Sequence, residues 1–194
     1  MNRFGRGAIF IVIISALTGC QASPPDTAPL VTSPLLAELD DSWSPIEAGG
    51  DTTCSDGSDF RFFVRVADPN ELVVYFQGGG ACWTGASCDL SGDPTYKPLA
   101  DEQLRSASGV EMEEGTMHGM MAFGHPDNPF ADYSVVFVPY CTGDVHIGNK
   151  ITTYPIEATS ETPAREVTVH HRGYVNAMAA LDWTYDNFLS PDSI

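Results

Sequence analysis

Three stretches of the chain have the hydrophobic pattern of β-strands. Residues 59–66 alternate polar and apolar positions, as a half-buried strand does, and an apolar run at 72–76 follows a turn at 67–70. We expect these two strands to pair as a hairpin. Residues 134–138 form a nearly unbroken apolar run, which is typical of a strand covered on both faces.

A helix is expected at 173–188, where apolar residues recur at intervals of three and four. The recurring residues are Tyr174, Ala177, Met178, Leu181, Tyr185 and Phe188. This stripe predicts an amphipathic helix whose apolar face packs on the sheet. His170 and His171 precede it, and we assign them to hydrogen bonding in the core rather than to catalysis. A parallel sheet alternates strands with crossover helices, and only one convincing crossover is present, so we expect an α/β sheet that is incomplete within these residues.

The strand at 72–76 runs directly into Gln77-Gly78-Gly79-Gly80-Ala81-Cys82-Trp83. Glycines at the carboxyl end of a strand expose backbone N–H groups, which suits the binding of an oxyanion. A tight turn that lets two backbones pack closely would also explain them. The two common phosphate-binding loops are excluded, because their defining lysine and third glycine are missing.

A second loop, Thr142–His146, follows the strand at 134–138, at the edge where open α/β sheets bind ligands. Asp144 and His146 invite an acid–base assignment. Alternate residues of an extended segment point to opposite faces, however, so we expect them to line a pocket or to be structural. Gly78 and Trp83 are expected to line the same pocket.

Residues 89–128 have a weaker pattern, with a short helix expected near 99–106. A cluster of thioether and imidazole groups follows, made of Met112, Met117, Met120, Met121, His118 and His125. Copper binding is one interpretation, but methionine more often fills irregular apolar gaps. We expect this segment to be a loop over the pocket.

Four motifs occur in a fixed order. They are Thr53-Cys54-Ser55-Asp56-Gly57-Ser58, the glycine loop continued to Cys88, Val138–Gly148, and His170–Tyr174. In this order they resemble the pectin acetylesterase family of serine esterases, which includes the Wnt deacylase Notum. The resemblance extends from Cys54 to the last residue. It implies an α/β-hydrolase sheet with flanking helices, an oxyanion hole at Gly79 and Gly80, catalysis by Ser, Asp and His, and no cofactor.

The nucleophile of an α/β hydrolase sits in Gly-x-Ser-x-Gly, and no such pentapeptide occurs between Met1 and Ile194. The resemblance places it one strand beyond the helix at 173–188. We therefore expect the N-terminal portion of a serine carboxyl-ester hydrolase, incomplete at the C-terminus and inactive alone. The alternatives are a non-catalytic, surface-anchored binding lipoprotein on the same scaffold and an acidic structural module held by disulfides.

The N-terminus has the pattern of a leader. Arg3 and Arg6 precede the apolar run 8–14, which is too short to span a bilayer and is typical of a signal peptide. Leu17-Thr18-Gly19-Cys20 has the form of a bacterial lipobox with Cys20 lipidated; an ordinary signal with a chance cysteine is the alternative. We expect a lipoprotein signal at 1–20, a Pro-rich tether at 21–50 and the hydrolase part at 51–194. Gln21 favours sorting to the outer membrane, hence an exported lipoprotein at the cell surface.

Four further cysteines remain, Cys54, Cys82, Cys88 and Cys141, an even number in a protein expected to be exported. Three pairings are possible. Cys82 and Cys88 bracket a short loop and can close locally, which leaves Cys54 for Cys141; the family resemblance supports this pairing. Zinc is the alternative, but the absence of Cys-x-x-Cys and an oxidising compartment favour disulfides, so no metal is expected.

The net charge is −17, from 9 basic and 26 acidic residues. A polyanion of this kind excludes nucleic acid as a partner and disfavours de-esterified pectin, which is itself polyanionic. We expect an O-acylated glycan or a small ester as substrate, and membrane contact through the lipid anchor. Solubility in a saline habitat would explain the acidity equally well.

Overall fold

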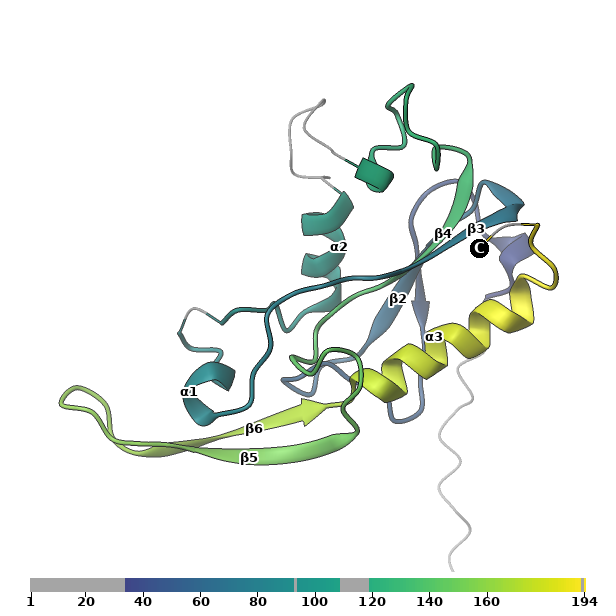
Figure 1. The fold of residues 1–194 in the computed structure, drawn as a ribbon. Coiled ribbons are helices and arrows are strands. Elements are labelled where there is room, and N and C mark those ends of the chain that lie inside the picture. Colours follow the sequence, from purple (N-terminus) through teal and green to yellow (C-terminus); the bar gives the residue numbers. More distant parts are fainter. Residues whose placement is uncertain (1–33, 93, 109–118, 193) are drawn as a thin grey trace, which may run out of the picture.

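The computed structural model describes residues 34–92, 94–108, 119–192 and 194. Its centre is a four-stranded sheet of order β1-β2-β4-β3 (Figure 1). The strands are β1 (Ser44–Glu47), β2 (Arg61–Arg65), β3 (Asp68–Phe76) and β4 (Tyr133–Val138). β3 and β4 run parallel, whereas β1 pairs antiparallel with β2, and β2 antiparallel with β4. The result is a mixed α/β fold.

Helices and loops cover both faces of this sheet. Phe62 of β2 lies on one face and meets Trp183 of helix α3 (Gly173–Asn187) edge to face, with ring centroids 5.5 Å apart. Phe137 of β4 lies on the other face and contacts Trp43. Helix α2 (Ala100–Ser108) covers this second face, where its Asp101 pairs with Arg61. The apolar run 134–138 is therefore buried on both sides, as its pattern predicted.

The predicted hairpin between 59–66 and 72–76 is wrong, because β4 inserts between β2 and β3. The chain crosses the start of β4 at Ala67, whose N–H donates to the buried hydroxyl of Ser134, and that hydroxyl donates in turn to the carbonyl of Asp68. An apolar strand with two buried faces is most stable with a hydrogen-bonding neighbour on each edge. β2 and β3 supply these two neighbours.

The helix predicted at 173–188 is present, but its buried face differs from the expected stripe. Tyr174 and Tyr185 are 51% and 67% exposed. The buried residues are Gly173, Asn176, Ala177, Ala180, Trp183 and Thr184. Asn176 is buried because its side chain accepts from the N–H of Thr53 and donates to the carbonyl of the same residue. Ala177 and Phe188 of the predicted stripe are buried, so hydrophobicity alone identified the buried face only in part.

Two strand regions were not predicted from the sequence. Residues 44–47, within the expected tether, form β1, and Ile46 is fully buried. A separate hairpin of β5 (Lys150–Ile156) and β6 (Arg165–His171) extends away from the main sheet (Figure 1), and the short helix α1 (Gly85–Cys88) contacts both of its strands. No prediction was made for it.

Some predictions lie outside the described residues. These are the leader with Cys20, the segment 21–33, and Met112, Met117 and His118 of the methionine-rich segment. In the part that is described, the short helix expected near 99–106 is α2, and Gly119–Met121 forms a 3-10 turn. No helix among the described residues is long and apolar enough to cross a membrane.

Candidate active site

The glycine loop begins at the carboxyl end of β3, beside the end of β4. Gln77 continues the pairing of the two strands, since its N–H donates to the carbonyl of Val138 at 3.0 Å. Its side-chain oxygen accepts from the N–H of Tyr140 at 3.2 Å, and its carbonyl lies 2.9 Å from Nε2 of His146. Gln77 thus joins the glycine loop to the loop after β4.

Close packing explains two of the three glycines. A Cβ on Gly79 would lie 2.5 Å from Cδ1 of Tyr140, and one on Gly80 would lie 2.2 Å from Cβ of Thr95. Gly78 is different, because a Cβ there would meet nothing within 4 Å. The packing interpretation therefore accounts for Gly79 and Gly80 whether or not they also bind an oxyanion.

The backbone donors of these glycines are not equivalent. The N–H of Gly80 donates to the carbonyl of Thr95 at 3.0 Å. Gly79 is exposed, and within the described part of the chain its N–H has no hydrogen-bond acceptor. Of the two glycines expected to form the oxyanion hole, Gly79 thus has a backbone donor open to an oxyanion, whereas Gly80 would first have to leave Thr95.

The other residues predicted for the pocket separate into two groups. Gly78 and Trp83 are exposed, and Trp83 is 70% accessible to solvent. Asp144 and His146 lie in the loop after β4, which is tied to the glycine loop by a hydrogen bond from the N–H of Cys82 to the carbonyl of Gly143 at 2.9 Å. The two loops thus meet at one end of the sheet.

Asp144 binds protein donors with both carboxylate oxygens. Oδ1 accepts from the Thr142 hydroxyl at 2.6 Å and from the N–H of His146 at 3.2 Å, and Oδ2 accepts from the N–H of Gly173 at 2.7 Å. Among the described residues, no hydrogen bond joins this carboxylate to the His146 ring. These contacts fit a structural role for Asp144 better than an acid–base pair.

The same loop has an unusual backbone. Val145 and His146 have φ of 56° and 59°, a left-handed conformation that residues with a Cβ seldom adopt. The N–H of Val145 donates to the hydroxyl of Tyr140 at 2.8 Å, and the His146 ring packs against Tyr140 and Phe76. Burial raises the pKa of Tyr140, so its hydroxyl stays protonated at neutral pH. These contacts stabilise the strained turn.

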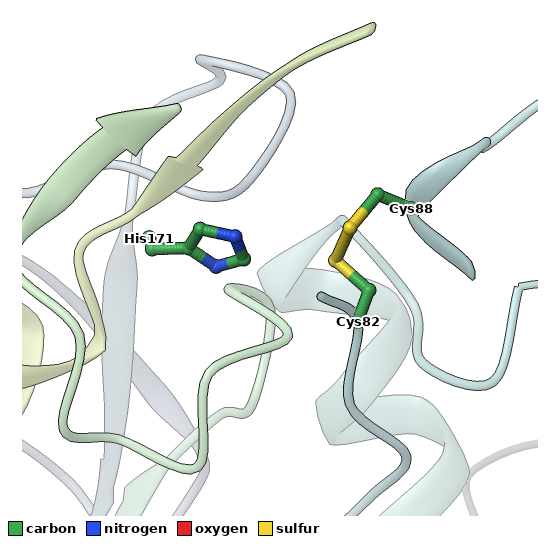
Figure 2. A group of neighbouring side chains, drawn as sticks. All are labelled: Cys82, Cys88 and His171. Atoms are coloured by element: carbon green, nitrogen blue, oxygen red, sulfur yellow. A yellow bond between two sulfur atoms is a disulfide. The ribbon is translucent and has the colours of Figure 1, made fainter. Parts of the chain in front are cut away.

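Cys82 and Cys88 form the predicted local disulfide, with their Cα atoms 4.9 Å apart. Figure 2 shows the imidazole of His171 pointing toward it. Nδ1 of His171 lies 3.1 Å from the carbonyl of Thr142, and Nε2 lies 3.0 Å from the hydroxyl of Tyr154. The expectation of core hydrogen bonding for His171 is confirmed.

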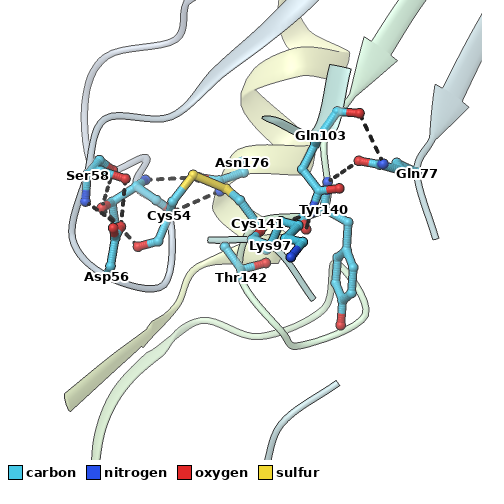
Figure 3. The surroundings of a disulfide bond; sticks show 12 residues. Cys54, Asp56, Ser58, Gln77, Lys97, Gln103, Tyr140, Cys141, Thr142 and Asn176 are labelled. Carbon is cyan, nitrogen blue, oxygen red and sulfur yellow. Dashed lines mark hydrogen bonds between the residues drawn. A yellow bond between two sulfur atoms is a disulfide. The ribbon is translucent and has the colours of Figure 1, made fainter. Parts of the chain in front are cut away.

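The second predicted disulfide, Cys54–Cys141, is also present and spans 87 residues (Figure 3). Both cysteines are fully buried. Beside it, the N–H of Ser55 donates to the carbonyl of Cys141 at 2.9 Å. The bridge therefore fixes the end of β4 to the segment that precedes β2.

Two glutamines that the sequence analysis missed hold the start of the loop after β4. Buried Gln103 of α2 donates to the carbonyls of Tyr140 and Lys97, and Gln77 donates to the carbonyl of Gln103 at 3.3 Å (Figure 3). A polar residue on the inward face of the predicted helix at 99–106 was the available signal. Polar groups buried there need partners, and here the partners are loop carbonyls.

The described residues of the methionine-rich segment do not line the site formed by the glycine loop and the loop after β4. Met120 and His125 line a surface hollow of about 330 Å³ together with Asn128 and Phe130. Met121 is buried in the main core, and Met112, Met117 and His118 lie outside the described residues.

The pectinacetylesterase family profile matches residues 46–182, which include both disulfides, the glycine loop and most of α3. The chain belongs to this family. It is 26% identical over 99 residues to palmitoleoyl-protein carboxylesterase notum2 of Xenopus laevis, an alignment that covers 50% of this chain and 19% of that protein. It is also 26% identical over 102 residues to palmitoleoyl-protein carboxylesterase NOTUM of Schmidtea mediterranea, covering 50% and 18%. The chain thus aligns with less than one fifth of the length of these relatives, which are carboxylesterases by name.

Proposed function

We propose that this chain is the N-terminal portion of an exported serine carboxyl-ester hydrolase with an α/β-hydrolase sheet. The observation that carries the proposal is the position of the exposed Gly79 N–H, at the carboxyl end of the third strand in a member of the pectinacetylesterase family. In α/β hydrolases one oxyanion donor comes from the loop after the third strand. The strand order and the parallel β3–β4 pair are compatible with this fold.

In this proposal each group has a limited role. The Gly79 N–H stabilises the oxyanion of the tetrahedral intermediate, and the residue after the catalytic serine supplies another donor. Gly80 contributes only if its N–H leaves Thr95. The loops that carry Trp83 and His146 border the substrate, which we propose to be an O-acylated glycan or a small ester. Gly-x-Ser-x-Gly does not occur in these 194 residues, so they are proposed to be inactive by themselves.

The test compares the 194-residue chain with the longest protein that the same gene encodes. The longer protein should hydrolyse p-nitrophenyl acetate, and a serine-directed phosphonate should block this hydrolysis. The hydrolysis rate of the short chain should not exceed that of a heat-treated control. Activity of the short chain that survives repurification would contradict the proposal.

A variant of the longer protein then tests the oxyanion role. Gly79→Ala should lower kcat per folded molecule, by up to the roughly 10²–10³-fold expected for one oxyanion donor, because the new methyl displaces the loop. Gly78→Ala is the matched control and should keep kcat. If kcat per folded molecule is unchanged in Gly79→Ala, the assigned role is wrong.

A non-catalytic binding lipoprotein on the same scaffold is the second candidate. It is favoured by the hydrogen bond between Gly80 and Thr95 and by the packing that already explains both glycines. The DNA beyond codon 194 separates the two candidates, since a Gly-x-Ser-x-Gly elbow supports the esterase and a stop codon supports the binding protein.

Export and anchoring belong to the same proposal. Two disulfides are typical of proteins that fold in an oxidising compartment. The leader 1–20 would direct export, Cys20 would carry the lipid, and the residues after it would form the tether. Together these features support an outer-membrane or cell-surface location.

A further inference from the structure

Cys82, Cys88 and His171 form a compact buried cluster. Each offers one ligand atom, and these atoms all lie within 4.8 Å of one another. The three residues are 5%, 0% and 8% exposed. They come from the glycine loop, from α1 and from the end of β6, so the cluster joins three separate segments. The disulfide joins the two sulfurs, and the imidazole, held by Thr142 and Tyr154, points toward them.

We propose that this cluster is a zinc site in the reduced protein. A dithiol reductant would be oxidised to its own disulfide while Cys82–Cys88 becomes two thiols. Zn²⁺ would then bind both sulfurs and the His171 ring and release the two thiol protons to solvent. In the oxidised protein the same sulfurs are bonded to each other and bind no metal. The site therefore exchanges a covalent bridge for a metal bridge.

The geometry suits zinc. Zinc–sulfur bonds of about 2.3 Å and zinc–nitrogen bonds of about 2.0 Å place tetrahedral ligands about 3.5 to 3.8 Å apart. The ligand atoms already lie within 4.8 Å of one another, and the two sulfurs move apart from bonding distance when the disulfide opens. Two thiolates also neutralise the ion, so no net charge is buried. The hydroxyl of buried Tyr96, which lies 3.8 Å from Sγ of Cys82, is near enough to supply the fourth ligand.

The surroundings of His171 also resemble those of a metal ligand. The carbonyl of Thr142 can only accept, so Nδ1 carries the proton and the lone pair is on Nε2. A backbone carbonyl on the distal nitrogen is the usual partner of a zinc-bound histidine. Tyr154 donates to Nε2 at 3.0 Å, and its hydroxyl must rotate away when the metal binds.

The site would hold the glycine loop when the disulfide is open. Cys82 lies in that loop, two residues after Gly80, and Cys88 ends α1. Helix α1 packs on β5 so closely that a Cβ on Gly85 would lie 2.0 Å from the carbonyl oxygen of Pro155. A metal bridge to His171 would keep the loop, α1 and the hairpin together under reducing conditions. This role does not depend on the esterase proposal.

The experiment is a titration of the full 194-residue chain with Co²⁺, the spectroscopic substitute for zinc. The chain is reduced with a phosphine, which does not compete as a dithiol chelator would. With one equivalent of Co²⁺, the reduced protein should show a thiolate-to-cobalt charge-transfer band and tetrahedral d–d bands. Both should disappear when Zn²⁺ displaces the Co²⁺. Oxidised protein should show neither. A reduced protein without these bands would overturn the proposal.

Variants distinguish this site from chance binding by reduced thiols. His171→Gln keeps a donor for Thr142 but removes the ligand, and should weaken Co²⁺ binding by more than the roughly tenfold cost of losing an outer-shell partner. His170→Gln, one residue away, is the matched control and should bind like wild type. Cys82→Ala/Cys88→Ala should abolish binding, because among the described residues Cys54 and Cys141 belong to no cluster of three ligands.

Two further results decide the interpretation. Tyr154→Phe removes the competing hydroxyl and should bind Co²⁺ at least as tightly as wild type. Weaker binding in this variant would contradict ligation through Nε2. Circular dichroism of the reduced chain reports whether it is folded. If an unfolded chain binds the metal, His171→Gln and His170→Gln will behave alike, and the proposed site is then wrong.

Discussion

The carboxylate of Asp144 accepts a hydrogen bond from the backbone N–H of Gly173 at 2.7 Å, across 29 residues of sequence. Gly173 is the first residue of α3, and the side chain at the N-cap, Arg172, makes no capping hydrogen bond. Asp144 therefore caps α3 from the loop after β4, and its charge lies where the helix dipole favours an anion. The loop and the helix are thereby coupled.

Asp144→Ala should destabilise the fold. Loss of a helix cap costs about 1 to 2 kcal/mol, and the buried N–H of Gly173 loses its acceptor. Asp144→Asn keeps an oxygen acceptor without the charge, so its stability should lie between those of Asp144→Ala and the wild type. Urea denaturation of both variants measures the difference, with Asp182→Asn on the exposed side of α3 as the control. Wild-type stability of Asp144→Ala would show that the cap is unimportant.

The glycine loop predicts a contrast among neighbouring positions. Gly79→Ala and Gly80→Ala should each lower the free energy of unfolding by about 1 to 3 kcal/mol, because their new methyl groups meet Tyr140 and Thr95. Gly78→Ala meets no atom within 4 Å and should change stability little. Thermal melting of the three variants tests this order. Equal melting temperatures would contradict the packing.

The two disulfides should differ in their contribution to stability. Loop entropy assigns about 4 to 5 kcal/mol to Cys54–Cys141, which closes a loop of 87 residues, and about 2 kcal/mol to Cys82–Cys88, whose cysteines are 6 apart. Denaturation of the Cys54→Ala/Cys141→Ala and Cys82→Ala/Cys88→Ala variants measures how much free energy of unfolding each disulfide contributes. A larger loss from the short loop would show that local packing outweighs chain entropy.

Asp89 provides a pH-dependent contact. Arg165 forms a two-pronged ion pair with it, and together with Ser91 lowers the pKa of Asp89 from 3.8 to about 2. Because the folded pKa is the lower one, the contribution is complete above about pH 4 to 5 and is lost as the pH falls toward 2.

Asp89→Asn should therefore lower the melting temperature at pH 7 by about 1 to 3 °C, as expected for an exposed pair, and should match wild type near pH 2. Arg165→Gln should show a similar dependence of the melting temperature on pH. The double variant should lower the melting temperature by less than the sum of the two single variants. A difference that persists unchanged to pH 2 would exclude the ionised pair as its cause.

Cys20 carries the prediction of anchoring. Expressed in a bacterial host, the whole chain should label with palmitate and fractionate with membranes, because an acyl chain buries many methylenes in the bilayer. Cys20→Ser should abolish the label and release the protein. Unchanged membrane association in this variant would contradict the lipobox assignment.

The sequence by itself determined several local elements and the family, and the family resemblance supported one of the three possible disulfide pairings. Two of these signals are local, because the apolar run 134–138 and the three- and four-residue spacing at 173–188 each depend on residues close together in the chain. The cysteine and glycine motifs are recognised by their order along the chain. Such signals survive without knowledge of the rest of the fold. They predicted β4, α3 and the two disulfides.

Tertiary structure decided strand neighbours, the buried side of α3 and the state of each glycine. Nothing between 59 and 76 indicates that β4 will insert between β2 and β3, because hydrogen bonding between strands is non-local. Asn176 is buried only because Thr53, 123 residues away, satisfies its amide. Likewise, the Gly80 N–H is occupied because Thr95 folds back onto it. These partners are distant in sequence, and packing alone brings them together.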